Sequence, residues 1–131
     1  MHNLFSAYLE KIEKAVQDLK NAYIEVYEEE VLTPSRMNLR IRIRFQNNEL
    51  LELNEAVIAE TEKTLTHLSY RYHLQDKNNQ LIFRYDNTPH HPSIKSFPHH
   101  KHRPDEVLAV YQKPSITDVI AEVRKTFILT K

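Results

Sequence analysis

The sequence predicts an α+β fold with an N-terminal helix, an antiparallel sheet of about five strands, a crossing segment rich in histidine and proline, and a C-terminal helix. Two observations carry this prediction. Hydrophobic residues recur at helical spacing at both ends of the chain, and at a period of two in between. The chain has 131 residues, 40 % of them hydrophobic, which is enough for one modest core. We therefore expect a single domain over residues 1–131.

Amphipathic helices are predicted at the two ends. Over residues 3–20, apolar side chains gather on one face, as they do in a helix that packs on a sheet. Near the other end, Ser115 is suited to cap a helix, and Asp118 stands where it completes a capping box. An apolar stripe then continues to Phe127, so we expect a last helix from Ser115 onward.

The first strands follow from strict alternation of apolar and polar residues. This alternation predicts strands over residues 22–32, 39–45 and 49–55. A three-residue loop over residues 46–48 pairs Ile43 with Leu51 and Arg42 with Glu52, whereas a two-residue loop would set Ile43 against Glu52. We therefore predict the three-residue loop, in which Glu52 neutralises Arg42.

A second hairpin is predicted over residues 64–75 and 80–87, with a four-residue loop between its strands. Closing this loop sets Tyr72 opposite Phe83 on an apolar face and Arg71 beside Arg84 on the other face. Two adjacent arginines repel each other unless an anion offsets their charge. That anion is either a bound ligand or Asp86, and both interpretations stay open. A short strand over residues 107–110 comes after the crossing segment.

Composition excludes several classes of site. The chain has no cysteine, so thiolate nucleophiles and cysteine zinc sites are excluded, and no glycine, so phosphate-cradling glycine loops are excluded too. Turns must use other residues, and Asn47-Asn48 and Asn78-Asn79 fit because asparagine tolerates a positive φ. No apolar run has the length of a membrane helix and the N-terminus lacks a signal-peptide profile, so we expect a cytoplasmic protein with no membrane contact.

The segment around the crossing is where the sequence indicates chemistry. Seven of the eight histidines fall between residues 67 and 104, and histidine both gives and takes protons near neutral pH. Residues 66–104 carry six lysines and arginines against two acids, which suits a nucleic-acid contact or a solvated face. The prolines favour an extended segment without regular structure, in which His100 and His102 point one way and His99 and Lys101 the other.

Two runs in this segment resemble the TumE family of bacterial and archaeal toxins: Leu81-Ile-Phe-Arg-Tyr-Asp-Asn-Thr-Pro-His-His-Pro and Phe97-Pro-His-His-Lys-His. The positions that match the family's motif are Arg84, Asp86, His90, His91, His100, Lys101 and His102. The resemblance implies the toxin half of a toxin–antitoxin pair, silenced by a small antitoxin, often a helix-turn-helix protein. Many members carry glycine in the hairpin turn where this chain has Asn78-Asn79.

The leading hypothesis is an endoribonuclease that needs no metal or other cofactor. Cleavage of RNA through its own 2′-hydroxyl needs a base, an acid and cations around the phosphate. The candidates for base and acid are His90 or His91 and His100 or His102. The other candidate roles are phosphate clamps by Lys101, Arg84 and Arg71, stacking of bases on Tyr72 or Tyr85, and orientation by Asp86.

Two alternatives stay open. In the first, His100 and His102, joined by Asp86 and by His90 or His91, bind zinc or another divalent ion. In the second, the protein is a non-catalytic module that binds RNA or a protein partner, and its histidines brace loops through hydrogen bonds.

Overall fold

The computed structural model describes residues 2–89 and 93–129. Its elements, in chain order, are α1 (His2–Gln17), β1 (Ala22–Thr33), β2 (Arg36–Phe45), β3 (Leu50–Ala59), β4 (Leu65–Gln75), β5 (Leu81–Asp86), β6 (His100–Arg103), β7 (Glu106–Ala109) and α2 (Ile116–Leu129). The α+β class is confirmed, with seven strands in place of about five. None of the helices in the described ranges has the length and apolar character needed to cross a bilayer.

The missed strand is β6, which lies inside the crossing segment where the sequence analysis expected no regular structure. Its four residues fit between Pro98 and Pro104, so no proline interrupts its hydrogen bonding. It pairs with β5 on one side and with β7 on the other. The edge of β5 offers unpaired backbone groups, and β6 satisfies them.

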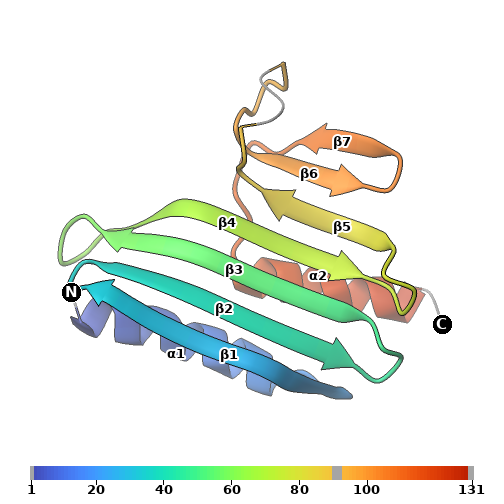
Figure 1. Ribbon diagram of the computed structural model, residues 1–131, viewed down its shortest axis with the longest axis horizontal. Helices are drawn as coiled ribbons and strands as arrows, with labels where there is room; N and C mark the ends of the chain where they lie inside the picture. Colours follow the sequence, from blue (N-terminus) through green and yellow to red (C-terminus); the bar gives the residue numbers. More distant parts are fainter. Residues whose placement is uncertain (1, 90–92, 130–131) are drawn as a thin grey trace.

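All seven strands form one antiparallel meander in the order of the sequence, from β1 to β7 (Figure 1). The strands β1 to β4 are long, whereas β5 pairs only with residues 71–75 at the end of β4. The short strands β5, β6 and β7 therefore form a narrower wing on one half of the sheet, as Figure 1 shows.

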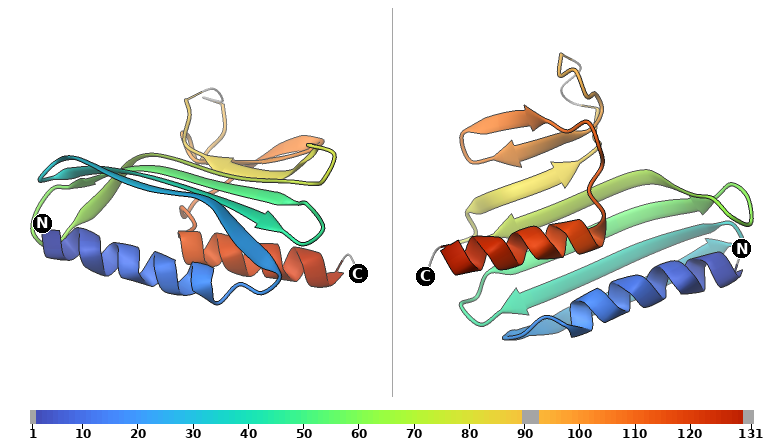
Figure 2. Two further views of the ribbon diagram at one scale, coloured as in Figure 1. Left: turned by 60° about the horizontal axis from the view of Figure 1, so that its bottom comes forward. Right: turned by 180° about the vertical axis from the view of Figure 1, so that it is seen from behind.

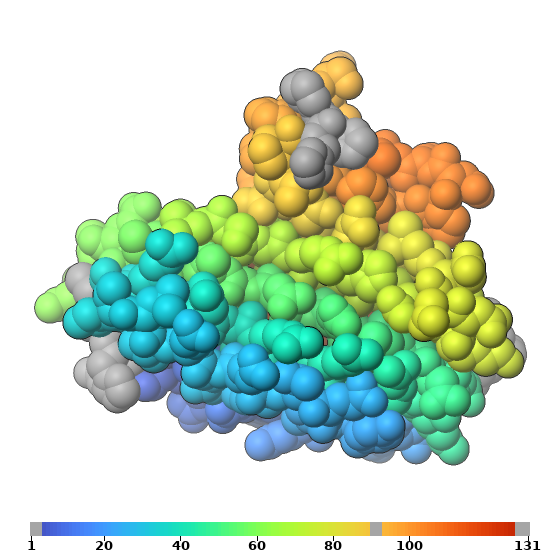
Figure 3. All heavy atoms as spheres, in the orientation of Figure 1, coloured from blue at the N-terminus to red at the C-terminus, as the bar shows by residue number. Residues whose placement is uncertain are grey.

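Both helices pack on the same face of this sheet (Figure 2). The core between them is made by alternate residues of β2, β3 and β4, and by one stripe of each helix. Ile41, Leu53 and Val119, from three of these elements, have no exposed surface. Neither α1 nor α2 covers the opposite face, which we call the open face and which Figure 3 shows.

The start of α2 confirms the predicted capping box. The backbone N–H of Asp118 donates to Ser115 Oγ over 3.1 Å, and the backbone N–H of Ser115 donates to Asp118 Oδ2 over 3.0 Å. These two bonds satisfy backbone donors that the first turn of a helix leaves without intrahelical partners.

The first hairpin has the predicted three-residue loop. The N–H of Phe45 donates to the carbonyl of Glu49 over 2.9 Å, and Asn48 takes a φ of 68°. Ile43 consequently pairs with Leu51, and Arg42 with Glu52. An ion pair of 3.4 Å joins Arg42 to Glu52, as the sequence predicted.

The predicted register of the second hairpin is wrong by two residues. Its loop is also of the three-residue kind, since the N–H of Asp76 donates to the carbonyl of Gln80 over 2.9 Å and Asn79 has a φ of 62°. A bulge next to Leu74 then shifts the strands once more.

Because of this shift, Arg71 lies opposite Asp86 and Tyr72 opposite Tyr85. A two-residue shift keeps every side chain on its predicted face. It removes the expected pairing of Arg71 with Arg84, because the partner of Arg84 on β4 is His73.

The positive φ of Asn48 gives a stability prediction. A β-branched side chain is disfavoured in this region, so Asn48→Val should lower the free energy of unfolding by about 1–2 kcal/mol. Asn48→Gly should change it little, because glycine has no Cβ to clash. Urea denaturation of both variants measures the difference. Equal losses in the two variants would contradict the argument.

Candidate functional site

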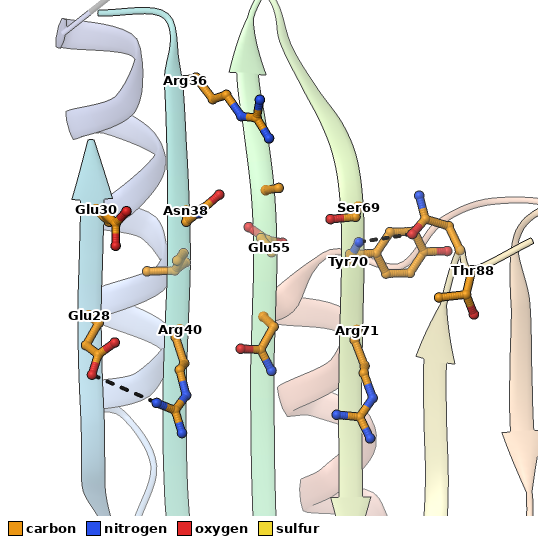
Figure 4. Close-up of a pocket in the computed structure, with 14 residues that line it drawn as sticks. Glu28, Glu30, Arg36, Asn38, Arg40, Glu55, Ser69, Tyr70, Arg71 and Thr88 are labelled. Carbon is orange, nitrogen blue, oxygen red and sulfur yellow. Dashed lines mark hydrogen bonds and ion pairs between the residues drawn. The ribbon is translucent and has the colours of Figure 1, made fainter. Parts of the chain in front are cut away.

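The open face carries two rows of polar side chains that run across the strands. The register places the first row on consecutive strands from β1 to β6, and its residues are Glu28, Arg40, Asn54, Arg71, Asp86 and His100. The second row lies two residues along each strand and comprises Arg42, Glu52, His73, Arg84 and His102. In Figure 4, Arg40 and Arg71 stand at the same level of the sheet with β3 between them.

The two rows meet at Asp86, which is only 2 % exposed. His100 Nε2 lies 2.7 Å from Asp86 Oδ1, and His102 Nε2 lies 3.5 Å from Oδ2. Arg84 Nε donates to Oδ2 over 3.0 Å, while the N–H and hydroxyl of Thr88 donate to Oδ1 over 3.1 and 2.6 Å. We call Asp86, His100, His102 and Arg84 the Asp86 cluster.

The carboxylate of this cluster is held in its charged form. Burial alone would raise the pKa of Asp86, but the Thr88 hydrogen bonds and the neighbouring imidazoles hold it below its ordinary value. His100 is itself buried, and its Nδ1 lies 2.8 Å from the carbonyl of Pro98. His102 stays 15 % exposed at its side chain and can reach a ligand on the open face.

A hollow of about 570 Å³ lies on the open face beside this cluster. Its lining comes from β1 to β4 and from Asn87 and Thr88, and it includes Arg36, Arg40 and Arg71 (Figure 4). Within the described ranges, Arg36 and Arg71 form no side-chain hydrogen bond or ion pair. Both are exposed, so their charges are available to an anionic ligand.

Two arginines of β2, Arg42 and Arg44, do form ion pairs. Arg42 Nε lies 2.9 Å from one oxygen of Glu25, and Arg44 Nε lies 3.3 Å from the other. The hydrogen bonds from Arg44 help to hold the pKa of the Glu25 carboxyl below its ordinary value. Arg42 and Arg44 are therefore neutralised, whereas Arg71 is not.

Three of the predicted substrate contacts point to the other side of the sheet. Lys101 lies under α2, where its Nζ donates to Glu122 over 2.7 Å. Tyr72 is fully buried, and Tyr85 donates its hydroxyl to Glu122 over 2.6 Å. None of these three side chains shares the open face with Asp86, so the predicted phosphate clamp and base stacking do not fit their positions.

The crossing segment contains three more histidines, His90, His91 and His99. His90 and His91, both predicted acid–base groups, lie outside the described residues. His99 points away from the Asp86 cluster, with its Nδ1 2.8 Å from the hydroxyl of Tyr70. The predicted alternation of His100 and His102 against His99 and Lys101 is therefore confirmed.

A second polar cluster, which the sequence analysis missed, is buried beneath the helices around Glu55. Tyr8 donates to Glu55 Oε1 over 2.5 Å, Tyr72 donates to Oε2, and His67 Nε2 lies 3.0 Å from Oε2. Lys113 Nζ then donates to the hydroxyl of Tyr72 over 2.8 Å. The alternation of Leu51, Leu53 and Glu55 was a signal, because it places a carboxylate on the core face.

The Glu55 cluster gives a pH prediction for stability. Burial acts to raise the pKa of Glu55, but His67 and the two tyrosines outweigh it and lower that pKa. A lowered pKa in the folded state stabilises the protein above about pH 4, and this contribution is lost as the pH falls through the folded value. Glu55→Gln should therefore be less stable than the wild type at pH 7, with a gap that narrows below about pH 4. Thermal melts between pH 3 and 8 measure it, and a gap independent of pH would contradict it.

The chain matches a known protein family over most of its length. The family model described as Toxin TumE covers residues 10–127, which include the Asp86 cluster and the whole sheet. No curated protein and no solved structure matches the chain. The match agrees with the resemblance of the two motif runs around Asp86 and His100. The chain therefore belongs to the TumE family of toxins.

Proposed function

We propose that this toxin is an endoribonuclease that holds RNA on its open face and cleaves it at the Asp86 cluster. The observation that carries the proposal is the first row of polar residues, which places Arg71 directly opposite Asp86. Among the described residues, the side chain of Arg71 has no hydrogen-bond or ion-pair partner. Cations next to a positioned carboxylate and imidazoles are the groups that phosphodiester cleavage needs. A cellular RNA target fits the cytoplasmic location expected from the sequence.

RNA binding would depend on the phosphate backbone. Arg36 and Arg71 line the hollow beside the cluster and can each pair with a phosphate, whereas Arg40, which also lines it, lies 3.9 Å from Glu28. The tyrosines predicted for stacking, Tyr72 and Tyr85, contact other protein groups beneath the sheet. The proposal therefore relies on charge and hydrogen bonding, not on aromatic stacking.

In the metal-free mechanism predicted from the sequence, His102 is the histidine of the cluster that can reach the substrate. Asp86 would orient it, and Arg84 would stabilise charge on the phosphate. General acid–base catalysis needs a second proton carrier. His90 and His91 remain sequence-based candidates for that role.

The partner expected for a toxin of this family is a cognate antitoxin, which we propose to be a small helix-turn-helix protein. Expression of the toxin alone should arrest growth, and co-expression of the antitoxin should restore it. The target in this proposal is RNA, so fragmentation of cellular RNA should accompany the arrest.

Loss of His102 tests the nuclease directly. Tag-free wild type should fragment total cellular RNA, and His102→Ala should slow this about 100-fold or more, as expected for a general acid or base. His99→Gln is the matched control, since His99 lies three residues away and faces Tyr70. Intact RNA with the wild type, with and without added divalent metal, would contradict the proposal.

Loss of Arg71 tests the binding face. Arg71→Ala should weaken RNA binding about tenfold, since a charge-assisted contact contributes roughly 1.5–3 kcal/mol. Arg44→Ala removes the same charge from the same face, but Arg44 is already paired with Glu25 and its loss should matter much less. Fluorescence anisotropy with labelled RNA, repeated over a salt series, measures both. Equal losses from the two variants would show that general charge, not the site, binds RNA.

A further inference from the structure

We infer that Asp86, His100 and His102 form a binding site for one divalent metal ion such as zinc. The inference rests on the proposed nuclease but replaces its metal-free mechanism, because His102 as a metal ligand could not also act as the acid or base. Binding of the ion itself can be tested without RNA, so the two proposals can fail separately.

His100 carries a hydrogen on its Nδ1 atom. Its Nδ1 lies 2.8 Å from the carbonyl of Pro98, and a carbonyl oxygen can only accept, so Nδ1 carries the hydrogen. In the neutral ring, Nε2 then presents a lone pair, and it faces Asp86 Oδ1 at 2.7 Å. Two lone pairs at this distance repel each other unless a cation lies between or beside them.

Hydrogen bonds from neighbouring groups hold His100 and Asp86 in place. A histidine that binds a metal through one nitrogen almost always donates its other N–H to a carbonyl or carboxylate, which fixes the ring. Pro98 provides that carbonyl, and Thr88 and Arg84 fix the carboxylate of Asp86 in the same way. These supporting bonds are the ones expected around a metal site.

The candidate ligand atoms lie close together. One ligand atom each from Asp86, His100 and His102 lie within 4.8 Å of one another. Ligand atoms about 2.1 Å from a tetrahedral zinc stand roughly 3.4 Å apart. His102 Nε2 lies 3.5 Å from Asp86 Oδ2, whereas His100 Nε2 lies only 2.7 Å from Oδ1, so zinc binding would have to move His100 and Asp86 slightly apart. Three protein ligands leave a fourth position for water or substrate, as in catalytic zinc sites.

The competing explanation is a second proton on His100, which would make an ion pair with Asp86. A proton satisfies one nitrogen, but both His100 and His102 direct Nε2 at the same carboxylate. His102 can donate from a neutral ring, so the ion pair needs a second proton on His100 alone, which would place two cations, His100 and Arg84, against one buried carboxylate. A metal ion instead uses both rings in their neutral form.

The position of the site fits a role in the proposed cleavage. The cluster lies on the open face, next to Arg71 and the hollow that Arg36 and Arg40 line. An ion there would polarise a phosphate oxygen or lower the pKa of a bound water.

The test measures zinc on protein purified without a histidine tag. The protein is stripped with EDTA, dialysed against zinc and then against buffer, and its metal content is determined by mass spectrometry. We expect about one zinc per chain, and isothermal titration should show at least about 100-fold weaker binding by Asp86→Asn and His102→Ala. The control His99→Gln should bind as the wild type does.

Folding of the variants is checked independently, because Asp86 is buried. Circular dichroism melts should show that zinc raises the melting temperature of the wild type and of His99→Gln, but not of a folded His102→Ala. His102 is the partly exposed member, so its loss should leave the fold intact.

The outcomes separate the two proposals. No zinc on the folded wild type would overturn the metal site, and NMR showing His100 protonated on both nitrogens would then identify the ion pair. Zinc binding without any RNA cleavage would support the metal site and contradict the nuclease. RNA cleavage in EDTA by a protein that binds no zinc would support the nuclease and contradict the metal site.

Discussion

The carboxylate of Asp86 is the group on which the open face depends. It ends β5, accepts two hydrogen bonds from Thr88 and one from Arg84, and lies against two imidazoles. Without its negative charge, Arg84 would lose its ion-pair partner and would lie beside two imidazoles with no anion. The same group thus fixes the turn out of β5 and gathers the candidate catalytic side chains.

Alternation along β6 separates two kinds of chemistry within three residues. His100 and His102 point to the open face, whereas Lys101 points beneath the sheet to Glu122 on α2. One ion pair therefore attaches the strand to the helix layer while its neighbours reach the site. This division explains why a compact motif such as His-Lys-His contains both a structural residue and functional candidates.

Much of the fold could be predicted from the sequence, because its patterns are local. The three-residue loop, the pairing of Ile43 with Leu51 and the capping box at Ser115 all depend on neighbouring residues. The strand β6 could not be predicted in the same way, since four residues between prolines carry little periodicity. Glu55 was visible in the alternation, but its tyrosine partners come from β4 and α1, which only the tertiary structure brings together.

Asp86, Arg84, His100 and His102 were all named from the sequence, but the way β4 faces them was not predicted, and the reason is the second hairpin. A four-residue loop without a bulge would have placed Arg84, and not Asp86, opposite Arg71. The positive φ of Asn79 and the bulge next to Leu74 shift the strand by two residues and bring Asp86 into the row. The members of the Asp86 cluster all come from β5 and β6, so their pairing with one another does not depend on this loop. The loop instead decides which residue of β4 faces the cluster, and it places Arg71 opposite Asp86.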